Sequence, residues 1–214
     1  MPAEFFARPA QDVAADLVGK VLWHDGVGGG RLVEVEAYLP VADPACHGYR
    51  GLTSRNAALF GPPGTLYVFS SYGVHLCVNL VCYRDGVGTA VLVRAFAPLG
   101  DAAILRVNRN DRNGRLPLTA LAAGPGRVGQ ALGASKDWNG LPLGEGSDVV
   151  VLDDGERPPV EATPRIGLSR AVDLLLRFVV PESAYLSRGP RRGAPVLPAG
   201  WEDPGGPEST EAKG

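Results

Sequence analysis

Residues 31–38 read Arg-Leu-Val-Glu-Val-Glu-Ala-Tyr, a pattern that predicts a strand with unusual side chains on one face. Alternate residues of a strand point to the same side of a sheet, so Glu34, Glu36 and Tyr38 should share a face, about 7 Å apart between neighbours. An ordinary half-buried strand more often shows Val, Ile or Leu at such positions. Two carboxylates beside an aromatic ring therefore indicate a chemical role for this strand.

Three further segments predict neighbouring strands. Residues 65–70, 74–82 and 89–95 are apolar, rich in β-branched side chains and separated by turn residues. This is the pattern of strands joined by hairpins in a largely antiparallel sheet. Tyr72 precedes Gly73 in the first of these turns, so its ring should be exposed at a hairpin tip.

Shorter elements are expected around these strands. The spacing predicts strands at residues 21–23, 148–152 and 174–180, and helices at residues 11–18, 54–60, 101–108 and 124–132. Ser54 is the expected N-cap of the second helix, and residues 39–53 should form an ordered surface loop. We therefore predict an α/β (α+β) fold, a single domain with a curved, mainly antiparallel sheet flanked by helices and a protruding β-hairpin.

Composition limits the class of protein. A chain of 214 residues can bury a full core, and residues 1–190 are expected to form one domain. Residues 191–214 are rich in Pro and Gly and are predicted to be a disordered tail. The formal net charge of -2 argues against a histone-like binder that depends on net charge. Of the 21 basic residues 18 are Arg, however, and a guanidinium suits bidentate phosphate contact.

Cysteines and histidines give no sign of a metal site or a disulfide framework. Cys46, Cys77 and Cys82 contain no Cys-x-x-Cys pair, and the three histidines lack the spacing of metal ligands. We expect buried, reduced thiols, no metal and no other cofactor. The N-terminus does not read as a signal peptide and no apolar run approaches about 18 residues, so we expect a cytoplasmic protein with no membrane partner.

Glu36 is the sharpest candidate for chemistry, because a carboxylate between the apolar residues Val35 and Ala37 suits a general base. The alternative is a structural carboxylate that pairs with an arginine across the sheet. Glu34 on the same face raises the further alternative of a glycosidase-type carboxylate pair. We discount that pair, because adjacent same-face positions of one strand rarely flank a sugar ring from opposite sides.

Aromatic side chains gather near this strand, namely Tyr38, Tyr67, Phe69 and Tyr72. Without a functional role, at least one of Tyr67 and Phe69 would be expected to pack in the core. His47 would be expected to lie in a solvated loop. Asn79 interrupts an apolar run, and a buried amide needs hydrogen-bond partners. Asn79 therefore either caps a loop or contacts the edge of a ligand.

Several motifs follow one another in a fixed order. They are Val-Glu-Val-Glu-Ala-Tyr at 33–38, Asp-Pro-Ala-Cys-His at 43–47, Ser-Arg-Asn at 54–56, Pro-Gly-Thr-Leu-Tyr-Val-Phe-Ser-Ser-Tyr-Gly at 63–73, Cys-Val-Asn at 77–79, Val-Leu-Val-Arg-Ala at 91–95 and Gly-Pro at 124–125. This set closely resembles the alkyladenine DNA glycosylases, the human-type 3-methyladenine DNA glycosylase family. The resemblance extends from the N-terminal helix to about Val180.

The resemblance implies a monofunctional DNA glycosylase of base excision repair, without AP lyase activity. Such an enzyme swings a damaged purine nucleotide out of the duplex, because the sugar carbon under attack is inaccessible in the stack. By motif position, Tyr72 would fill the vacated space. Glu36 would orient and deprotonate the attacking water, with Arg94 and the carbonyl of Ile166 as further contacts of that water or of the neighbouring phosphate.

The resemblance also assigns a base pocket. Tyr38, His47 and Phe69 would enclose the flipped base, the backbone N–H of His47 would bond the purine edge, and Asn79 would exclude the 2-amino group of guanine. Phe69 occupies a position that is often Tyr in relatives, so a hydroxyl is missing there. The implied partner is double-stranded DNA containing damaged purines, bound by a monomer at the nucleoid of a bacterial cytoplasm.

Two groups of residues are candidates for contact with the DNA backbone. The first is a basic stripe at three-residue spacing, made of Arg106, Arg109, Arg112 and Arg115. Its alternative is a solvated helix face. In the second group, Gly126 and Arg127 would present N–H groups to a phosphate at a helix N-terminus, or would serve only as a loop stop.

Two other functions compete with the glycosylase. A nucleic-acid-binding module would use the aromatic tip and the arginines without catalysis. A carbohydrate hydrolase would require a second carboxylate opposite Glu36, and the loop sequences offer none. No lysine stands at the pocket by motif, so Schiff-base chemistry is not expected.

Overall fold

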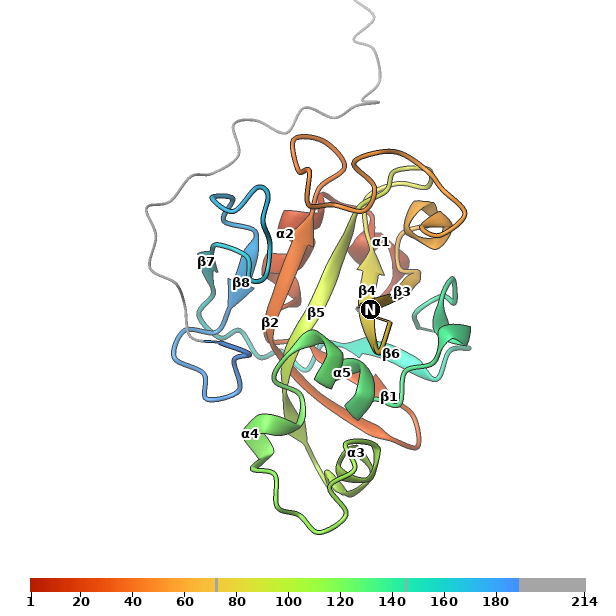
Figure 1. The fold of residues 1–214 in the computed structure, drawn as a ribbon. Helices are drawn as coiled ribbons and strands as arrows, with labels where there is room; N and C mark the ends of the chain where they lie inside the picture. The colour runs from red at the N-terminus through yellow and green to blue at the C-terminus, as the bar shows by residue number, and fades with distance from the viewer. Residues whose placement is uncertain (72, 145, 189–214) are drawn as a thin grey trace, which may run out of the picture.

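A computed structural model describes residues 1–71, 73–144 and 146–188 (Figure 1). The predicted tail at 191–214 and the predicted wedge residue Tyr72 lie outside the described residues. Within the described residues, no helix combines the length and the apolar character needed to cross a membrane.

One eight-stranded sheet organises the described chain, and every strand pair in it is antiparallel. The strands are β1 Val21–His24, β2 Gly28–Tyr38, β3 Leu66–Ser71, β4 His75–Val81, β5 Ala90–Leu99, β6 Val149–Leu152, β7 Glu161–Thr163 and β8 Arg177–Val179. Their order is β3-β4-β5-β2-β1-β6, with β8 joined to β2 and β7 joined to β8. This confirms the predicted mixed α/β domain with a curved, mainly antiparallel sheet.

The long strand β2 holds this sheet together. It pairs with β5 along one side, and on the other side it pairs first with β1, through residues 28–31, and then with β8, through residues 34–36. A register shift against β5 falls between Leu32 and Val35. Such bulges bend a strand, so β2 can serve both neighbours as the sheet curls.

Short helices surround the sheet. They are α1 Ala3–Phe6, α2 Ala10–Leu17, η1 Ala57–Phe60, α3 Ala103–Asn108, α4 Leu118–Leu121, α5 Pro125–Ala131 and η2 Lys136–Trp138. The predicted cap at Ser54 is wrong, since η1 begins at Ala57 and follows Asn56. The Asn56 carboxamide instead accepts hydrogen bonds from the N–H and the hydroxyl of Thr53, which fixes the turn before the helix.

Four elements were not predicted, namely α1, α4, η2 and β7. Each has only three or four residues, which is too few for a period to show. The strand predicted over 174–180 shortens to β8 for a related reason, because residues 174–176 pass into an irregular approach to the sheet.

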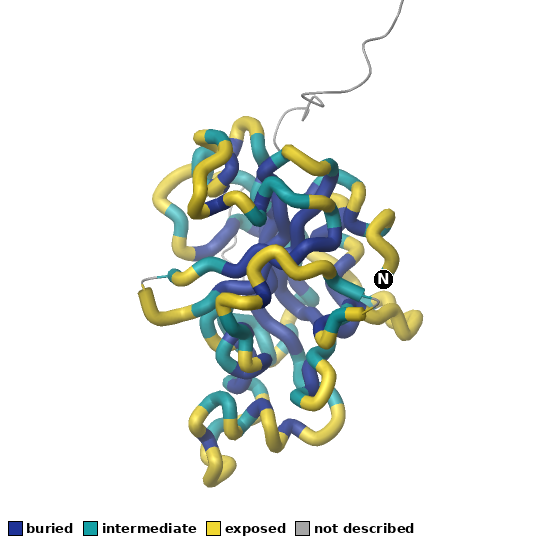
Figure 2. The backbone as a smooth tube through the Cα atoms, turned by 90° about the vertical axis from the view of Figure 1, so that its right-hand side faces the viewer, coloured by how far each residue is buried: buried dark blue, intermediate teal, exposed yellow. Residues whose placement is uncertain are grey.

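The two faces of β2, a mostly buried strand, have different environments. Buried residues gather at the centre of the molecule (Figure 2). Val35 and Ala37 belong to the main apolar core, on which α2 packs. Glu34, Glu36 and Tyr38 point to the opposite face, where their side chains join one hydrogen-bonded network. The predicted shared face of Glu34, Glu36 and Tyr38 is confirmed, although the register shift places Leu32 in the core with Val35.

Helix α5 lies directly on β4 because two of its residues lack side chains. A Cβ at Gly129 would come within 2.1 Å of the Leu76 carbonyl oxygen, and a Cβ at Gly126 would come within 2.9 Å of the His75 Cβ. The β3–β4 hairpin is therefore braced from one side by a closely packed helix. Its register pairs Ser71 with His75 across the turn.

Replacing Gly129 by Ala is expected to destabilise the protein by about 1–3 kcal/mol, because the helix must move off the strand. The matched variant Gly126→Ala meets the Cβ and Cγ of His75 at 2.9 Å rather than a backbone carbonyl oxygen at 2.1 Å, so it is expected to cost less stability than Gly129→Ala. Urea unfolding of both variants measures the difference. Equal losses of stability would contradict this packing argument.

Candidate active site

A row of side chains crosses four strands on the polar face of the sheet. The register pairs Tyr67 with Asn79, Asn79 with Leu92, and Leu92 with Glu36. Opposed residues of antiparallel strands project to the same face. Glu36 therefore shares a face with three residues that line a cavity.

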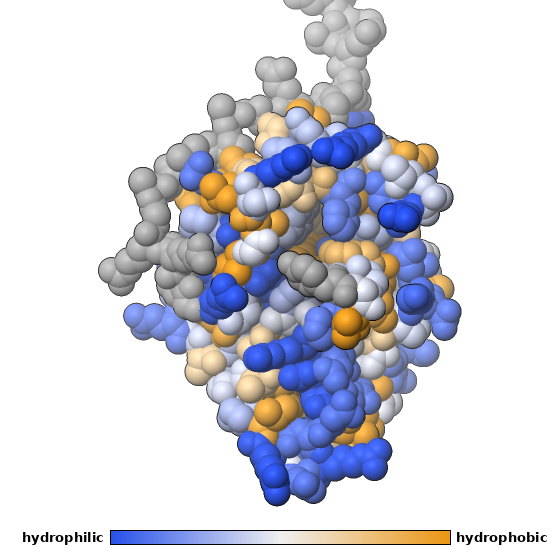
Figure 3. Space-filling view, in the orientation of Figure 1, coloured by the Kyte–Doolittle hydropathy of each residue, from blue (hydrophilic) through white to orange (hydrophobic). Residues whose placement is uncertain are grey.

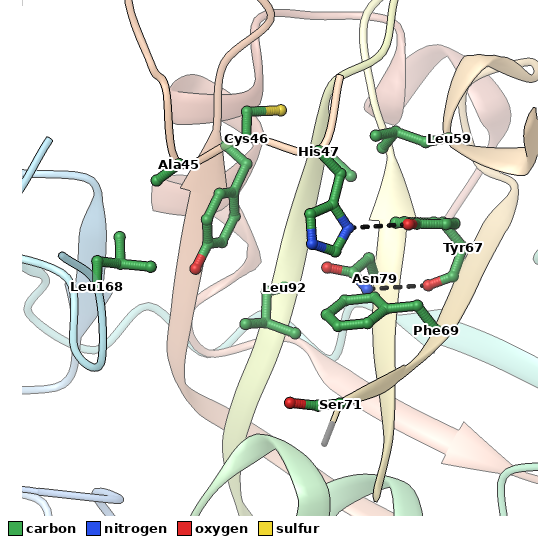
Figure 4. Close-up of a pocket in the computed structure, with 12 residues that line it drawn as sticks. Ala45, Cys46, His47, Leu59, Tyr67, Phe69, Ser71, Asn79, Leu92 and Leu168 are labelled. Atoms are coloured by element: carbon green, nitrogen blue, oxygen red, sulfur yellow. Dashed lines mark hydrogen bonds between the residues drawn. The ribbon is translucent and has the colours of Figure 1, made fainter. Parts of the chain in front are cut away.

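This cavity has a volume of about 200 Å³ (Figure 4). Its lining includes all four side chains assigned to a base pocket, namely Tyr38, His47, Phe69 and Asn79. Drug-sized ligands occupy pockets of about 300–1,000 Å³, so this smaller space suits a single heterocyclic group. The other contributors are mainly apolar or aromatic, among them Leu59, Tyr67, Leu92 and Leu168.

Three rings form one wall of the cavity. His47 and Phe69 meet edge to face at 4.6 Å between centroids, and Tyr67 stacks on Phe69 at 5.6 Å. His47 Nδ1 shares a 2.9 Å hydrogen bond with the Tyr67 hydroxyl. Burial lowers the pKa of His47 and raises the pKa of Tyr67 to about 12. Both side chains are therefore uncharged at neutral pH, and the wall is neutral.

The Asn79 amide has a defined orientation. Its nitrogen donates to the carbonyl oxygens of Tyr67, at 2.9 Å, and Cys77, at 3.4 Å. Both partners are acceptors, which fixes the assignment of the amide nitrogen and oxygen. The amide oxygen is left as an acceptor on the cavity side (Figure 4).

A buried ion pair holds the loop that carries His47. Arg165 donates to both carboxylate oxygens of Asp43, at 2.6 and 2.7 Å, and to the carbonyl oxygen of Ala37. Its guanidinium also lies over the Tyr38 ring, 4.5 Å from the centroid. Cation–π contact and bidentate pairing together fix the loop to the end of β2.

A second anchor acts on the main chain of His47. The Asn56 amide nitrogen donates to the carbonyl oxygens of His47, at 2.9 Å, and Gly51, at 3.0 Å. The N–H of His47 donates to no acceptor among the described residues. Asn56 therefore fixes the carbonyl group of His47, while the N–H of His47 stays available as a donor.

Glu36 is fully buried and has three hydrogen-bond partners. One oxygen accepts from the backbone N–H of Ile166 at 2.8 Å, and the other accepts from the Tyr38 hydroxyl at 2.9 Å and from Arg94 Nη1 at 3.2 Å. The ion pair with Arg94 is the cross-strand pairing considered as an alternative. Glu36 is connected to the cavity by its hydrogen bond with Tyr38, which belongs to the cavity lining. The Tyr38 hydroxyl stays protonated, because burial and the neighbouring Glu36 raise its pKa.

Glu34 is bound more completely than Glu36. It accepts from Arg177 Nε at 2.8 Å, from Arg94 Nε at 2.9 Å and from the hydroxyl and N–H of Ser187. Burial opposes ionisation, but these donors outweigh it and lower the pKa of Glu34. Both carboxylates bind the Arg94 guanidinium and do not face each other across an open space. The geometry therefore does not favour a glycosidase-type carboxylate pair.

The predicted arginine stripe does not follow one helix. Helix α3 ends at Asn108, so Arg109, Arg112 and Arg115 lie beyond its last residue. Arg106 donates to the Asp111 carboxylate and to the Leu116 carbonyl. Hydrophilic side chains nevertheless gather over this lower end of the molecule (Figure 3).

The other residues predicted to contact the DNA backbone lie next to residues of the protein itself. Arg109 bonds the Gln130 side chain, and Arg127 is exposed and donates to the Ala123 carbonyl at 3.3 Å. Gly126 faces His75. Contact of these residues with DNA stays a prediction.

Several residues of the site were missed in the sequence. Asp43 was noted only as part of a motif and Arg165 was assigned no role, although a charged residue inside a loop of small apolar residues is itself a signal of pairing. Leu168 had no signal. Ile166 was assigned through its carbonyl, whereas the structure shows its N–H at Glu36.

Comparison with known proteins shows which family this chain belongs to. Residues 4–184 match the model of the methylpurine-DNA glycosylase (MPG) family. The chain belongs to this family. The predicted resemblance is thereby confirmed over most of the chain.

Relatives from distant organisms show the same membership. A protein of Rhizobium meliloti (strain 1021) is 46% identical over 185 residues, which cover 86% of this chain and 95% of that protein. Burkholderia lata has a relative 44% identical over 194 residues, covering 87% and 90%. One from Methanoculleus marisnigri is 43% identical over 196 residues, covering 88% and 98%. Each carries the provisional name 3-methyladenine DNA glycosylase.

His47 is expected to titrate below the value of about 6.5 that is usual for histidine, because burial disfavours its charged form. Between these two pKa values the unfolded chain binds the proton more readily than the folded chain, so this residue lowers stability as the pH falls below about 6.5. NMR titration of the imidazole signals, assigned with His47→Gln, gives the midpoint. A midpoint at or above about 6.5 would contradict the burial argument.

Proposed function

We propose that this protein is a monofunctional DNA glycosylase that extrudes a damaged purine nucleotide from duplex DNA and hydrolyses its N-glycosidic bond. Membership of the methylpurine-DNA glycosylase family supports the reaction class. The observation that carries the proposal is the placement of Glu36 in the same strand row as the residues lining the cavity. A single acidic group then stands beside a pocket of the size of one base.

The pocket favours an extruded base over one in the duplex. A stacked nucleotide cannot bring its sugar carbon to a buried carboxylate, so the nucleotide must leave the stack. The rings of Tyr38, His47 and Phe69 line the space that the base would enter. Tyr72, by motif position, would fill the gap left in the duplex.

Glu36 would supply the chemistry by orienting and deprotonating water, while its charge stabilises the oxocarbenium-like sugar. The carboxylate is enclosed in this structure, so we propose that an entering nucleotide opens its environment. The contact most suited to yield is the one with Arg94, because at 3.2 Å it is the longest of the three. Arg94 keeps Glu34 and Ser187 as partners when that contact opens.

The cavity walls would select among purines in two ways. A cationic alkylated base gains from stacking on electron-rich rings, and the neutral His47 adds no repulsion. The backbone N–H of His47 would serve the edge of a neutral deaminated or etheno purine. Asn79 would exclude the 2-amino group of guanine by occupying its space, since two hydrogen bonds to the carbonyl oxygens of Tyr67 and Cys77 hold the amide in place.

Hydrolysis without a lyase step is part of the proposal. None of the described residues that line the cavity is a lysine, and a Schiff base requires an amine near the sugar. We further propose that the protein acts as a monomer on double-stranded DNA.

A nucleic-acid-binding module without catalysis is the competing function. It would use the same aromatic pocket and the exposed arginines, and it would leave Glu36 with a structural role only. The ion pair between Glu36 and Arg94 is the observation that favours it. The two functions differ in whether base is released.

Replacing Glu36 by Gln is expected to reduce base excision by about 10²–10⁴-fold, because the amide cannot accept the proton of water. Affinity for damaged duplex should stay within a few-fold of wild type, since the pocket walls are unchanged. Duplex oligonucleotides that each hold one modified purine, namely 3-methyladenine, 7-methylguanine, hypoxanthine or ethenoadenine, serve as substrates, and released base is measured. No release from any duplex by folded wild-type protein would overturn the proposal, and equal release by Glu36→Gln would remove Glu36 from the mechanism.

Replacing Asn79 by Ala is expected to raise the release of guanine-type bases relative to hypoxanthine, because a group that excludes the 2-amino substituent is removed. The comparison of both bases in one competition assay measures the ratio. Asn108→Ala is the matched control, since its amide also donates to a backbone carbonyl, that of Ala131, but lies outside the cavity lining. An unchanged ratio in Asn79→Ala would contradict exclusion by this residue.

A further inference from the structure

The last described segment of the chain reaches the buried carboxylates. Ser187 lies 153 residues after Glu34, yet its N–H donates to Glu34 Oε2 at 2.6 Å and its hydroxyl donates to Glu34 Oε1 at 2.7 Å. Hydrogen bonds to an ionised oxygen are short and strong. Ser187 therefore supplies two of the donors that keep Glu34 satisfied.

The same serine also binds Arg94. The guanidinium donates through Nε to Glu34 at 2.9 Å, through Nη1 to Glu36 at 3.2 Å and through Nη2 to Ser187 Oγ at 3.3 Å. Because a guanidinium is a rigid planar fork, fixing two of its nitrogens fixes the third. Glu34 and Ser187 together determine where Arg94 meets Glu36.

Arg177 anchors the segment at its other end. It donates through Nε to Glu34 at 2.8 Å, through Nη1 to Thr163 Oγ1 at 3.0 Å and through Nη2 to the carbonyl oxygen of Arg188 at 2.7 Å. Arg177 is fully buried and opposes Glu36 in the register of β2 and β8. Residues 187–188 are thus held by both members of the Glu34–Arg177 pair.

We propose that residues 187–188 form a strap that completes the catalytic site, with Ser187 and Glu34 as positioning residues that act on Glu36 through Arg94. The inference rests on the proposed function, because the fixed position of Arg94 matters only if Glu36 is catalytic. The hydrogen bond from Arg94 to Glu34, at 2.9 Å, is shorter than the one to Glu36, at 3.2 Å. Without the Ser187 hydroxyl, Arg94 loses one of its three partners and its orientation at Glu36 is no longer fixed.

The consequence is a loss of rate rather than of binding. The strap contacts the ion network and not the cavity, since neither Ser187 nor Glu34 lines it. Small displacements of a catalytic group can lower a rate by about 100-fold while substrate contacts persist. Ser187→Ala in the full-length chain is therefore expected to lower the single-turnover excision rate by about tenfold or more, with the dissociation constant for damaged duplex changed less than about threefold.

Two further variants separate this role from a contribution to folding. Ser187→Thr keeps the hydroxyl and should restore the rate to within a few-fold of wild type. Ser183→Ala is the matched control, because among the described residues the Ser183 hydroxyl accepts only from the nearby Tyr185 N–H, at 3.3 Å, and belongs to the same segment. Thermal melting of each variant, together with near-UV circular dichroism, reports whether the fold is kept.

The outcomes are distinct. A lower rate in Ser187→Ala with retained affinity, rescue by Thr and no effect in Ser183→Ala supports the strap. A wild-type rate in Ser187→Ala, or equal losses in the alanine and threonine variants, overturns it. A wild-type protein that binds damaged duplex but releases no base overturns the proposed function instead, so the two failures are distinguishable.

Discussion

The burial of two carboxylates on one face of β2 is the constraint on which the rest of the site depends. Glu34 and Glu36 are both 0% exposed, and a buried charge without partners costs several kcal/mol, on the order of 3–5 when one partner of a pair is lost. Apart from the Tyr38 hydroxyl, the partners among the described residues come from outside β2. Arg94 comes from β5, Arg177 from β8 and Ser187 from the segment after β8, so the network ties the sheet to its last described residues.

The network treats the two carboxylates unequally, and this difference agrees with their proposed roles. Among the described residues, Glu34 accepts four hydrogen bonds, two from guanidiniums, one from a backbone N–H and one from a hydroxyl, which commits it to structure. Glu36 accepts one bond from a backbone N–H, one from a tyrosine hydroxyl and one longer bond from Arg94. The proposed role of Glu36 requires it to exchange a hydrogen-bond partner for water, and its longer bond to Arg94 suits that exchange. One strand thus carries a fixed and an exchangeable carboxylate two residues apart.

Local patterns in the sequence predicted what depends on neighbouring residues. The alternation over residues 31–38 predicted the shared face of Glu34, Glu36 and Tyr38, and the apolar segments predicted β3, β4 and β5. Pairings between distant residues have no such pattern, which is why the contacts of Asp43 with Arg165 and of Glu34 with Ser187 could not be anticipated. The three-residue spacing of the arginines did not show how they lie in space, because α3 ends at Asn108 and Arg109, Arg112 and Arg115 follow it.

The charges of the site are arranged so that the cavity walls stay neutral. Two carboxylates face two guanidiniums in the network, and Asp43 faces Arg165 behind Tyr38, so each set balances to zero. The rings that line the cavity are uncharged, because burial lowers the pKa of His47 and raises that of Tyr67. A cationic base would therefore meet no charged side chain among the described residues that line the cavity, and the nearest charges lie in ion pairs behind Tyr38. When the C–N bond breaks, its electron pair neutralises the base and the positive charge moves to the sugar, so a carboxylate near the sugar carbon would favour cleavage while the neutral walls hold the base.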